Sequence, residues 1–188
     1  MLKWKENGRF GKGVEAMYQV GENVLYGIHG VCRVAGTEER VLDRKKVAYL
    51  VLEPLEQKGA RFFVPSHNPA AMAKLRPVMT KEELDCLLCS QEVCQDSWID
   101  DENQRKQYYR SLINSGDRTA LLRMVRSLHQ HRQSQVAAGR KFHLCDENFL
   151  RDAQKLLNSE FSLVLGIEPG QVADYVLNRL SEDENMSG

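Results

Sequence analysis

Residues 18–36, YQVGENVLYGIHGVCRVAG, indicate the fold class of the first part of this 188-residue chain. β-Branched and aromatic residues gather there in three short runs, at 18–20, 23–26 and 30–36. Glycine-containing turn sequences separate the runs, and short apolar runs with such punctuation are typical of neighbouring strands. The stretch therefore predicts a strand–turn–strand meander.

Two further runs, at 47–54 and 60–65, are rich in the same residue types and end at Pro54 and Pro65. Proline cannot donate a ladder hydrogen bond, so it ends a strand well. Four or five short strands within about sixty residues predict a small SH3-like or Tudor-like β-barrel. Its expected interior positions are Val24, Val31, Leu50, Leu52 and Phe63.

Beyond residue 78 the sequence pattern changes from strands to helices. Thr80-Lys81-Glu82-Glu83 is a capping box, in which the hydroxyl and the carboxylate each bind a backbone amide of the first turn. Apolar residues then recur at spacings of three and four. The expected helices span 81–90, 101–114 and 118–135, with a fourth that Asp146 caps and Gly166 ends, and a last one over 168–180.

The predicted fold class is α+β, a small β-barrel followed by an all-α helical domain. The first residues are rich in lysine and glycine without any period, and the last residues are acidic, which is typical of disordered segments. The expected parts are a disordered extension 1–16, the barrel 17–78, the helical domain 79–180 and an acidic disordered tail 181–188.

Charge is strongly segregated in a chain whose net charge is zero. Residues 104–141 hold nine basic side chains and one acid, whereas residues 142–188 hold three basic side chains and nine acids. Such segregation indicates an anionic partner. Trp98 lies just upstream, and an aromatic wedge beside a basic helix suits bent or opened nucleic acid. The predicted DNA contacts are Trp98, Arg105, Lys106, Arg110, Arg126 and Arg132.

Other interpretations of these residues stay open. A basic helix face is often only solvated, and a loop tryptophan often packs over a helix end. The spacing Cys86-x-x-Cys89, with Cys94 or Cys145 nearby, also allows a metal or thiol sensor. The helical pattern around these cysteines indicates that they act as small apolar side chains, so no metal site is predicted.

Several function classes find no support in the sequence. It holds no phosphate-binding loop, no nucleophile elbow, no zinc-protease motif and no dinucleotide fingerprint. We therefore predict no catalytic residue, no cofactor and no enzymatic activity. The chain also has no long apolar run and no signal-like start, so we expect a cytoplasmic protein that does not enter membranes.

Five stretches together resemble the CarD/CdnL family of bacterial transcription regulators. They are VGENVLYGIHGV at 20–31, YLVL at 49–52, FVP at 63–65, SGD at 115–117, and Ala153-x-x-Leu156-Leu157-x-x-Glu160. The resemblance runs from Tyr18 to about Leu180.

This resemblance implies a Tudor-like domain, shared with transcription-repair coupling factors, that binds the β subunit of RNA polymerase. It also implies a helical domain that touches promoter DNA at the upstream edge of the bubble, where a tryptophan enters the minor groove. Trp98 takes that place here. Arg40 matches the family's arginine after the third strand, Phe63 replaces a basic residue, and Arg61 compensates from the same face. Together with Arg44 these residues are the predicted polymerase contacts.

The resulting hypothesis is a non-enzymatic regulator that is a monomer when free. It binds the polymerase β subunit and promoter DNA, and it stabilises the open complex through contacts that do not read sequence. It would then be associated with the nucleoid through RNA polymerase. The alternative is a protein-only adaptor whose basic helices dock an acidic protein.

Overall fold

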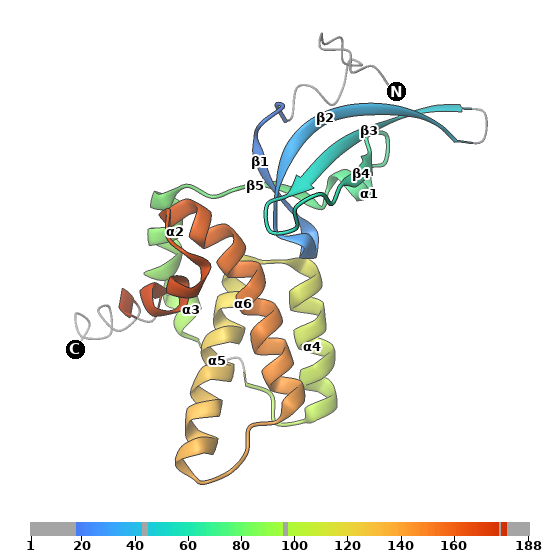
Figure 1. Ribbon diagram of the computed structural model, residues 1–188. Coiled ribbons are helices and arrows are strands. Elements are labelled where there is room, and N and C mark those ends of the chain that lie inside the picture. Colours follow the sequence, from blue (N-terminus) through green and yellow to red (C-terminus); the bar gives the residue numbers. More distant parts are fainter. Residues whose placement is uncertain (1–17, 43–44, 96–97, 177, 180–188) are drawn as a thin grey trace. The chain divides into compact units, whose positions relative to one another are not determined.

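The computed structural model describes residues 18–42, 45–95, 98–176 and 178–179 (Figure 1). The fold is α+β, as predicted, with an antiparallel sheet and a set of helices. Within the described residues the chain divides into two compact units. One holds the residues up to 24 together with 31–77, and the other holds 25–30 together with the residues from 78 onward.

The sheet has five strands in the order β4-β3-β2-β1-β5. They are β1 (Asn23–Tyr26), β2 (Val31–Leu42), β3 (Lys45–Pro54), β4 (Phe62–Pro65) and β5 (Leu75–Pro77). The expected closure into a barrel is not found, because β4 and β5 are the two edges of an open sheet. These edge strands have only four and three residues, so they offer few backbone groups for closing the sheet.

Three short elements and one register detail were not expected. The sequence did not predict β5, the one-turn helix α1 (Pro69–Met72), which Asn68 caps, or the one-turn helix α3 (Gln91–Cys94). Residues 18–20, expected as a strand, form none. In β2 the pairing with β3 shifts between Val34 and Gly36, so one extra residue bulges out of the ladder.

The pairing register decides which side chains of β4 enter the core. Val64 lies opposite Leu50, and Phe63 lies opposite Val51. Successive side chains of a strand point to opposite faces. Val64 is therefore buried with Leu50, whereas Phe63 is only partly buried on the other face. Its expected interior position is wrong, while Val24, Val31, Leu50 and Leu52 are buried as predicted.

The second unit is built of helices, and several of their ends lie where the sequence predicts them. They are α2 (Lys81–Leu88), α3 (Gln91–Cys94), α4 (Glu102–Ser115), α5 (Arg118–Ala137) and α6 (Leu144–Leu165), followed by the 3₁₀ turn η2 (Pro169–Gln171) and helical residues 172–176. The capping box at Thr80 is confirmed. Gly166 ends α6 in the left-handed conformation, as expected.

Helix α6 packs against α2, α4 and α5 and supplies a large share of the helical core (Figure 1). It begins at Leu144 with His143 at the cap position, so Asp146 is not the cap that was expected. Asp146 instead lies in the first turn and is 1% exposed. A second acid of the same helix, Glu160, is 2% exposed.

Glu160 joins three segments of the helical unit. Its carboxylate accepts hydrogen bonds from Arg118 Nε at 2.8 Å and from Arg118 Nη2 at 2.6 Å. It also accepts one from the backbone N–H of Met79, at 2.9 Å, just before α2. One buried carboxylate thus holds the starts of α2 and α5 against α6.

We predict that Glu160→Gln destabilises the helical unit by about 3 kcal/mol, the lower end of the range for breaking a buried pair, because Arg118 retains some contact with water. Asp152→Asn is the matched control, since Asp152 is an exposed acid on the same helix, and it should change stability by less than about 0.5 kcal/mol. Urea unfolding measures both. Equal stabilities of the two variants would contradict a structural role for Glu160.

Candidate functional site

The first candidate surface lies on the face of the sheet opposite to Val64 and centres on Phe63, which is partly buried. The guanidinium carbon of Arg40, from β2, lies 3.5 Å from the centre of the Phe63 ring. Nε of Arg40 also donates to Oε1 of Glu38 at 3.0 Å. Arginine over an aromatic ring is a favourable cation–π contact. The structure thus brings two of the predicted polymerase contacts together on one face.

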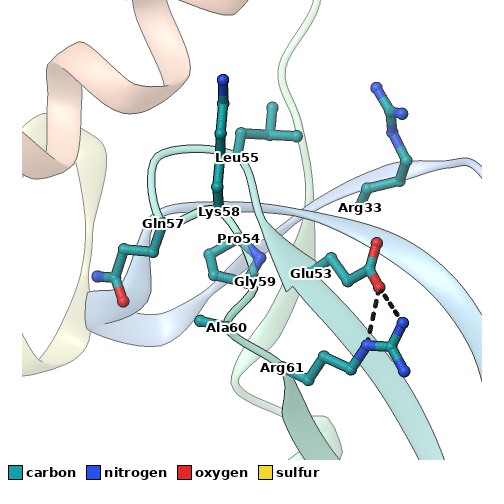
Figure 2. A pocket seen from close by; sticks show the side chains of 9 residues that line it. All are labelled: Arg33, Glu53, Pro54, Leu55, Gln57, Lys58, Gly59, Ala60 and Arg61. Atoms are coloured by element: carbon teal, nitrogen blue, oxygen red, sulfur yellow. Dashed lines mark hydrogen bonds and ion pairs between the residues drawn. The ribbon is translucent and has the colours of Figure 1, made fainter.

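Arg61 extends the same face beyond Phe63. It forms an ion pair with Glu53, with both Nε and Nη2 at 2.9 Å from Oε1 (Figure 2). In the strand ladder Glu53 also lies opposite Arg33, which is exposed. Arg44, the fourth predicted contact, lies outside the described residues.

A shallow hollow of about 630 Å³ adjoins this part of the face (Figure 2). Its lining is Arg33, Glu53, Pro54, Leu55, Gln57, Lys58, Gly59, Ala60 and Arg61. Three cations and one carboxylate line it, so its charge is positive overall. Together with Arg40 and Phe63 the hollow suits an acidic protein segment that also offers apolar contact.

The second candidate surface centres on Trp98, which precedes α4. Its indole stacks on the imidazole of His131, from α5, with ring centres 3.5 Å apart and planes 16° apart. The guanidinium carbon of Arg105 lies 4.2 Å from the centre of the indole. The indole N–H donates to Oδ1 of Asp100 at 3.0 Å. Trp98 is therefore a half-buried ring held by three neighbours.

Arg105 anchors this arrangement from inside the helical unit. Its Nε and Nη2 donate to the two carboxylate oxygens of Asp146, each at 3.0 Å. Its Nη1 donates to the carbonyls of Ile99 and Asp100 at 2.7 and 3.2 Å. Burial disfavours its charge, but the hydrogen bond and charge of Asp146 outweigh this and raise the pKa of Arg105.

Arg105 is 4% exposed, so this structure does not present its guanidinium to a phosphate, and its DNA contact stays a prediction. Four of the five guanidinium N–H donors bind Asp146 and the carbonyls of Ile99 and Asp100, so little of the group is left for a phosphate. Its position holds Trp98 and the backbone beside it instead.

The remaining predicted DNA contacts differ in their availability. Lys106 pairs with Glu102 one turn earlier, and that hydrogen bond raises the pKa of Lys106. Arg126 is partly buried. Arg110 and Arg132 are exposed. The expected outward basic side of α5 is therefore mostly covered, because α3, α4 and α6 all pack against that helix.

The turn between α5 and α6 adds residues that were not predicted as contacts. Arg140 and Lys141 are exposed there, one helical turn and a loop beyond Arg132. Two apolar side chains flank them, Val136 at 64% and Leu144 at 72% exposure. The sequence shows that Arg140 and Lys141 are neighbours, but only the fold shows that the whole turn is exposed. The α5–α6 turn lies at one end of the helical unit (Figure 1), and these four exposed side chains make it a basic, partly apolar tip.

The cysteines form no second site in the part of the chain that the structure describes. All five lie there and none forms a disulfide. In the same residues no group of three or more histidine, cysteine or acidic side chains is placed to hold a metal ion. None of the described helices combines the length and the apolar character that crossing a membrane requires.

Comparison with known protein families matches both halves of the chain. Residues 18–79 match the model described as CarD-like/TRCF RID domain, and residues 88–177 match the model described as CarD, C-terminal domain. No match to a curated protein was found. The two matched segments contain the sheet face and the Trp98 surface respectively.

We predict that the helical unit loses stability in acid partly through His131. Burial lowers the pKa of His131, although the charge of Asp146 opposes this. The unfolded chain therefore binds the proton more readily. The stability contribution of the neutral ring is complete above the ordinary histidine pKa of about 6.5 and is lost as the pH falls below it.

In His131→Phe the aromatic contact remains and the titration is absent. The melting temperature of the wild type should fall more than that of His131→Phe when the pH is lowered from about 7.5 to about 5.5. His129→Gln, on the same helix, is the control and should follow the wild type. Parallel pH profiles for wild type and His131→Phe would refute this role of His131.

Proposed function

Because the chain belongs to the CarD/CdnL family of RNA-polymerase-interacting, non-enzymatic transcription factors, we propose that it binds the polymerase β subunit and stabilises the promoter open complex. In this proposal a monomer docks through the sheet face, and the helical unit touches DNA at the upstream edge of the bubble. It acts in the cytoplasm, associated with the nucleoid through the polymerase. The observation that carries the proposal is the presence of both matched domains in one chain.

The sheet face has the features of a protein-docking surface. Phe63 supplies an aromatic anchor in contact with Arg40, and Arg33, Lys58 and Arg61 line the adjoining hollow with positive charge. Aromatic residues and arginine are enriched at the centres of interfaces. The short strand β4 is an edge of the sheet, and sheet edges are common sites of contact with a partner. Both features support docking of the polymerase on this side.

The helical unit has the features of a weak, sequence-independent DNA contact. Its exposed cations at Arg110, Arg132, Arg140 and Lys141 can neutralise phosphates. In this proposal the contacts go to phosphates and carry no sequence information, because they do not reach base edges. Trp98 is the group suited to insertion between strained base steps.

A protein-only adaptor is distinguished from this proposal by the salt dependence of DNA binding. Phosphate contact releases counterions, so the affinity falls steeply with salt, and each lost contact flattens the logarithmic slope by about one unit. Arg132→Ala, Arg140→Ala and Lys141→Ala should each show this change, whereas Lys155→Ala on the exposed side of α6 should not. DNA affinity that does not depend on salt would favour the adaptor.

Arg40→Glu should weaken binding to the isolated polymerase β subunit by about tenfold or more, because it removes the cation over Phe63 and places an acid in a basic surface. The matched control is Lys74→Glu, an equal charge reversal at an exposed position near β5. Calorimetric titration measures both variants. Unchanged affinity of Arg40→Glu with an intact fold would show that the polymerase docks elsewhere.

Trp98→Ala should shorten the lifetime of the open complex on a weak promoter while leaving polymerase docking intact. Loss of about 1.4 kcal/mol from the open state alone lowers the ratio of open to closed complex roughly tenfold. The melting temperature of the free protein is measured alongside, because Trp98 also packs on the helical core. A lowered melting temperature with an unchanged lifetime would mean that Trp98 only seals the fold.

A further inference from the structure

The indole of Trp98 already carries a stacked partner in the free protein. Its ring centre lies 3.5 Å from that of His131, with nearly parallel planes. This spacing is close to the rise of about 3.4 Å between stacked bases. A tryptophan that enters a base step must present a ring face to a base. That face is the surface that an aromatic side chain occupies here.

We infer that His131 occupies the ring face of Trp98 on which a nucleobase would stack. His131 is then a positioning residue, and an unpaired base displaces it from Trp98. The inference rests on the proposed function, since it names what Trp98 must give up in order to insert. It also assigns a role to a residue that lies 33 positions from Trp98 in the sequence and shares no motif with it.

The neighbours of Trp98 differ in how firmly they are held. Arg105 is bound to a buried carboxylate and to the carbonyls of Ile99 and Asp100, so it fixes the backbone beside Trp98. The imidazole of His131 has a neutral contact instead, with its Nε2 at 3.3 Å from Nε2 of Gln135. Displacing it separates no ion pair. A base would therefore displace His131 from Trp98, whereas Arg105 would keep its position.

The exchange is favourable only when a base is available. A base stacked on an aromatic side chain is generally a stronger contact than a pair of aromatic side chains. A paired base in closed duplex must first leave its own stack, which opposes insertion. At the edge of an opened region the bases are already unpaired, so insertion does not require this unstacking free energy again. His131 thus keeps Trp98 covered on closed DNA and releases it to melted DNA.

The test uses the full chain in a Trp4→Phe background, in which Trp98 is the sole tryptophan. The probe is a DNA fork with unpaired bases at the end of a duplex, and its affinity is read from quenching of Trp98 fluorescence. His131→Ala should raise the fork affinity about two- to tenfold, the worth of one aromatic pair. It should also raise acrylamide quenching of Trp98 in the free protein. His131→Phe restores a stack and should return both readouts to wild-type values.

Two matched variants make the outcome decisive. His129→Ala, two residues away on α5, should leave fork affinity unchanged. His131→Gln replaces the ring without an alanine cavity and serves if His131→Ala melts below the assay temperature. Unchanged or reduced fork affinity in the ring-free His131 variants, with Trp98 more open to acrylamide, would overturn the inference.

Open-complex lifetimes separate failure of the inference from failure of the proposed function. If Trp98→Ala shortens the lifetime and His131→Ala does not lengthen it, the inference is wrong and the proposed function stands. If Trp98→Ala leaves the lifetime unchanged while His131→Ala still raises fork affinity, the exchange is real and the open-complex role is wrong.

Discussion

Two buried carboxylates on helix α6 organise the helical unit. Asp146 and Glu160 are fourteen residues apart, about four turns, so they project from nearly the same side of the helix. Each binds the arginine near the start of another helix, Arg105 in α4 and Arg118 in α5. Buried ion pairs contribute little net stability over apolar residues of the same size, but breaking one is costly. Their effect is on the alignment of the helices. Each pair fixes the position of α4 or α5 along the axis of α6, and these positions set where Trp98 and the α5–α6 turn lie.

The same pairs explain why the charge of the sequence overstates the charge of the surface. The basic stretch 104–141 includes two arginines that bind carboxylates of α6 and a lysine that pairs with Glu102. Helical periodicity predicted four of the helices and several of their ends, since caps and left-handed glycines are local signals. It could not predict that Arg105 is buried, because its partner lies 41 residues away and nothing near either residue records the pairing. The proposed DNA surface therefore shifts from α5 toward the tip at Arg140 and Lys141.

In the sheet, the sequence predicted the four longer strands. It did not predict the features that depend on strand pairing, which are the buried face of β4 and the open edges of the sheet. The stretch from Phe62 to Val64 is apolar at three successive positions, so alternation alone does not say which side chain is buried. The opposition of Val64 to Leu50 decides it and turns Phe63 toward Arg40. The elements α1, α3 and β5 have three or four residues each, too few to show a period. Closure of a sheet depends on contacts between its first and last strands, which no local pattern records.

The two surfaces have different thermodynamic roles in the proposed mechanism. Docking on the polymerase supplies the helical unit at an effective concentration of about millimolar for short linkers, so its few phosphate contacts need not bind DNA tightly. Those contacts meet closed and open DNA alike, and a ligand that binds two states equally shifts neither. A group must distinguish the states for the protein to favour one. Trp98 is the candidate, because its ring face exchanges His131 for a base only where a base has left its pair. The balance between these two stacks then sets how far the protein shifts the promoter toward the open state.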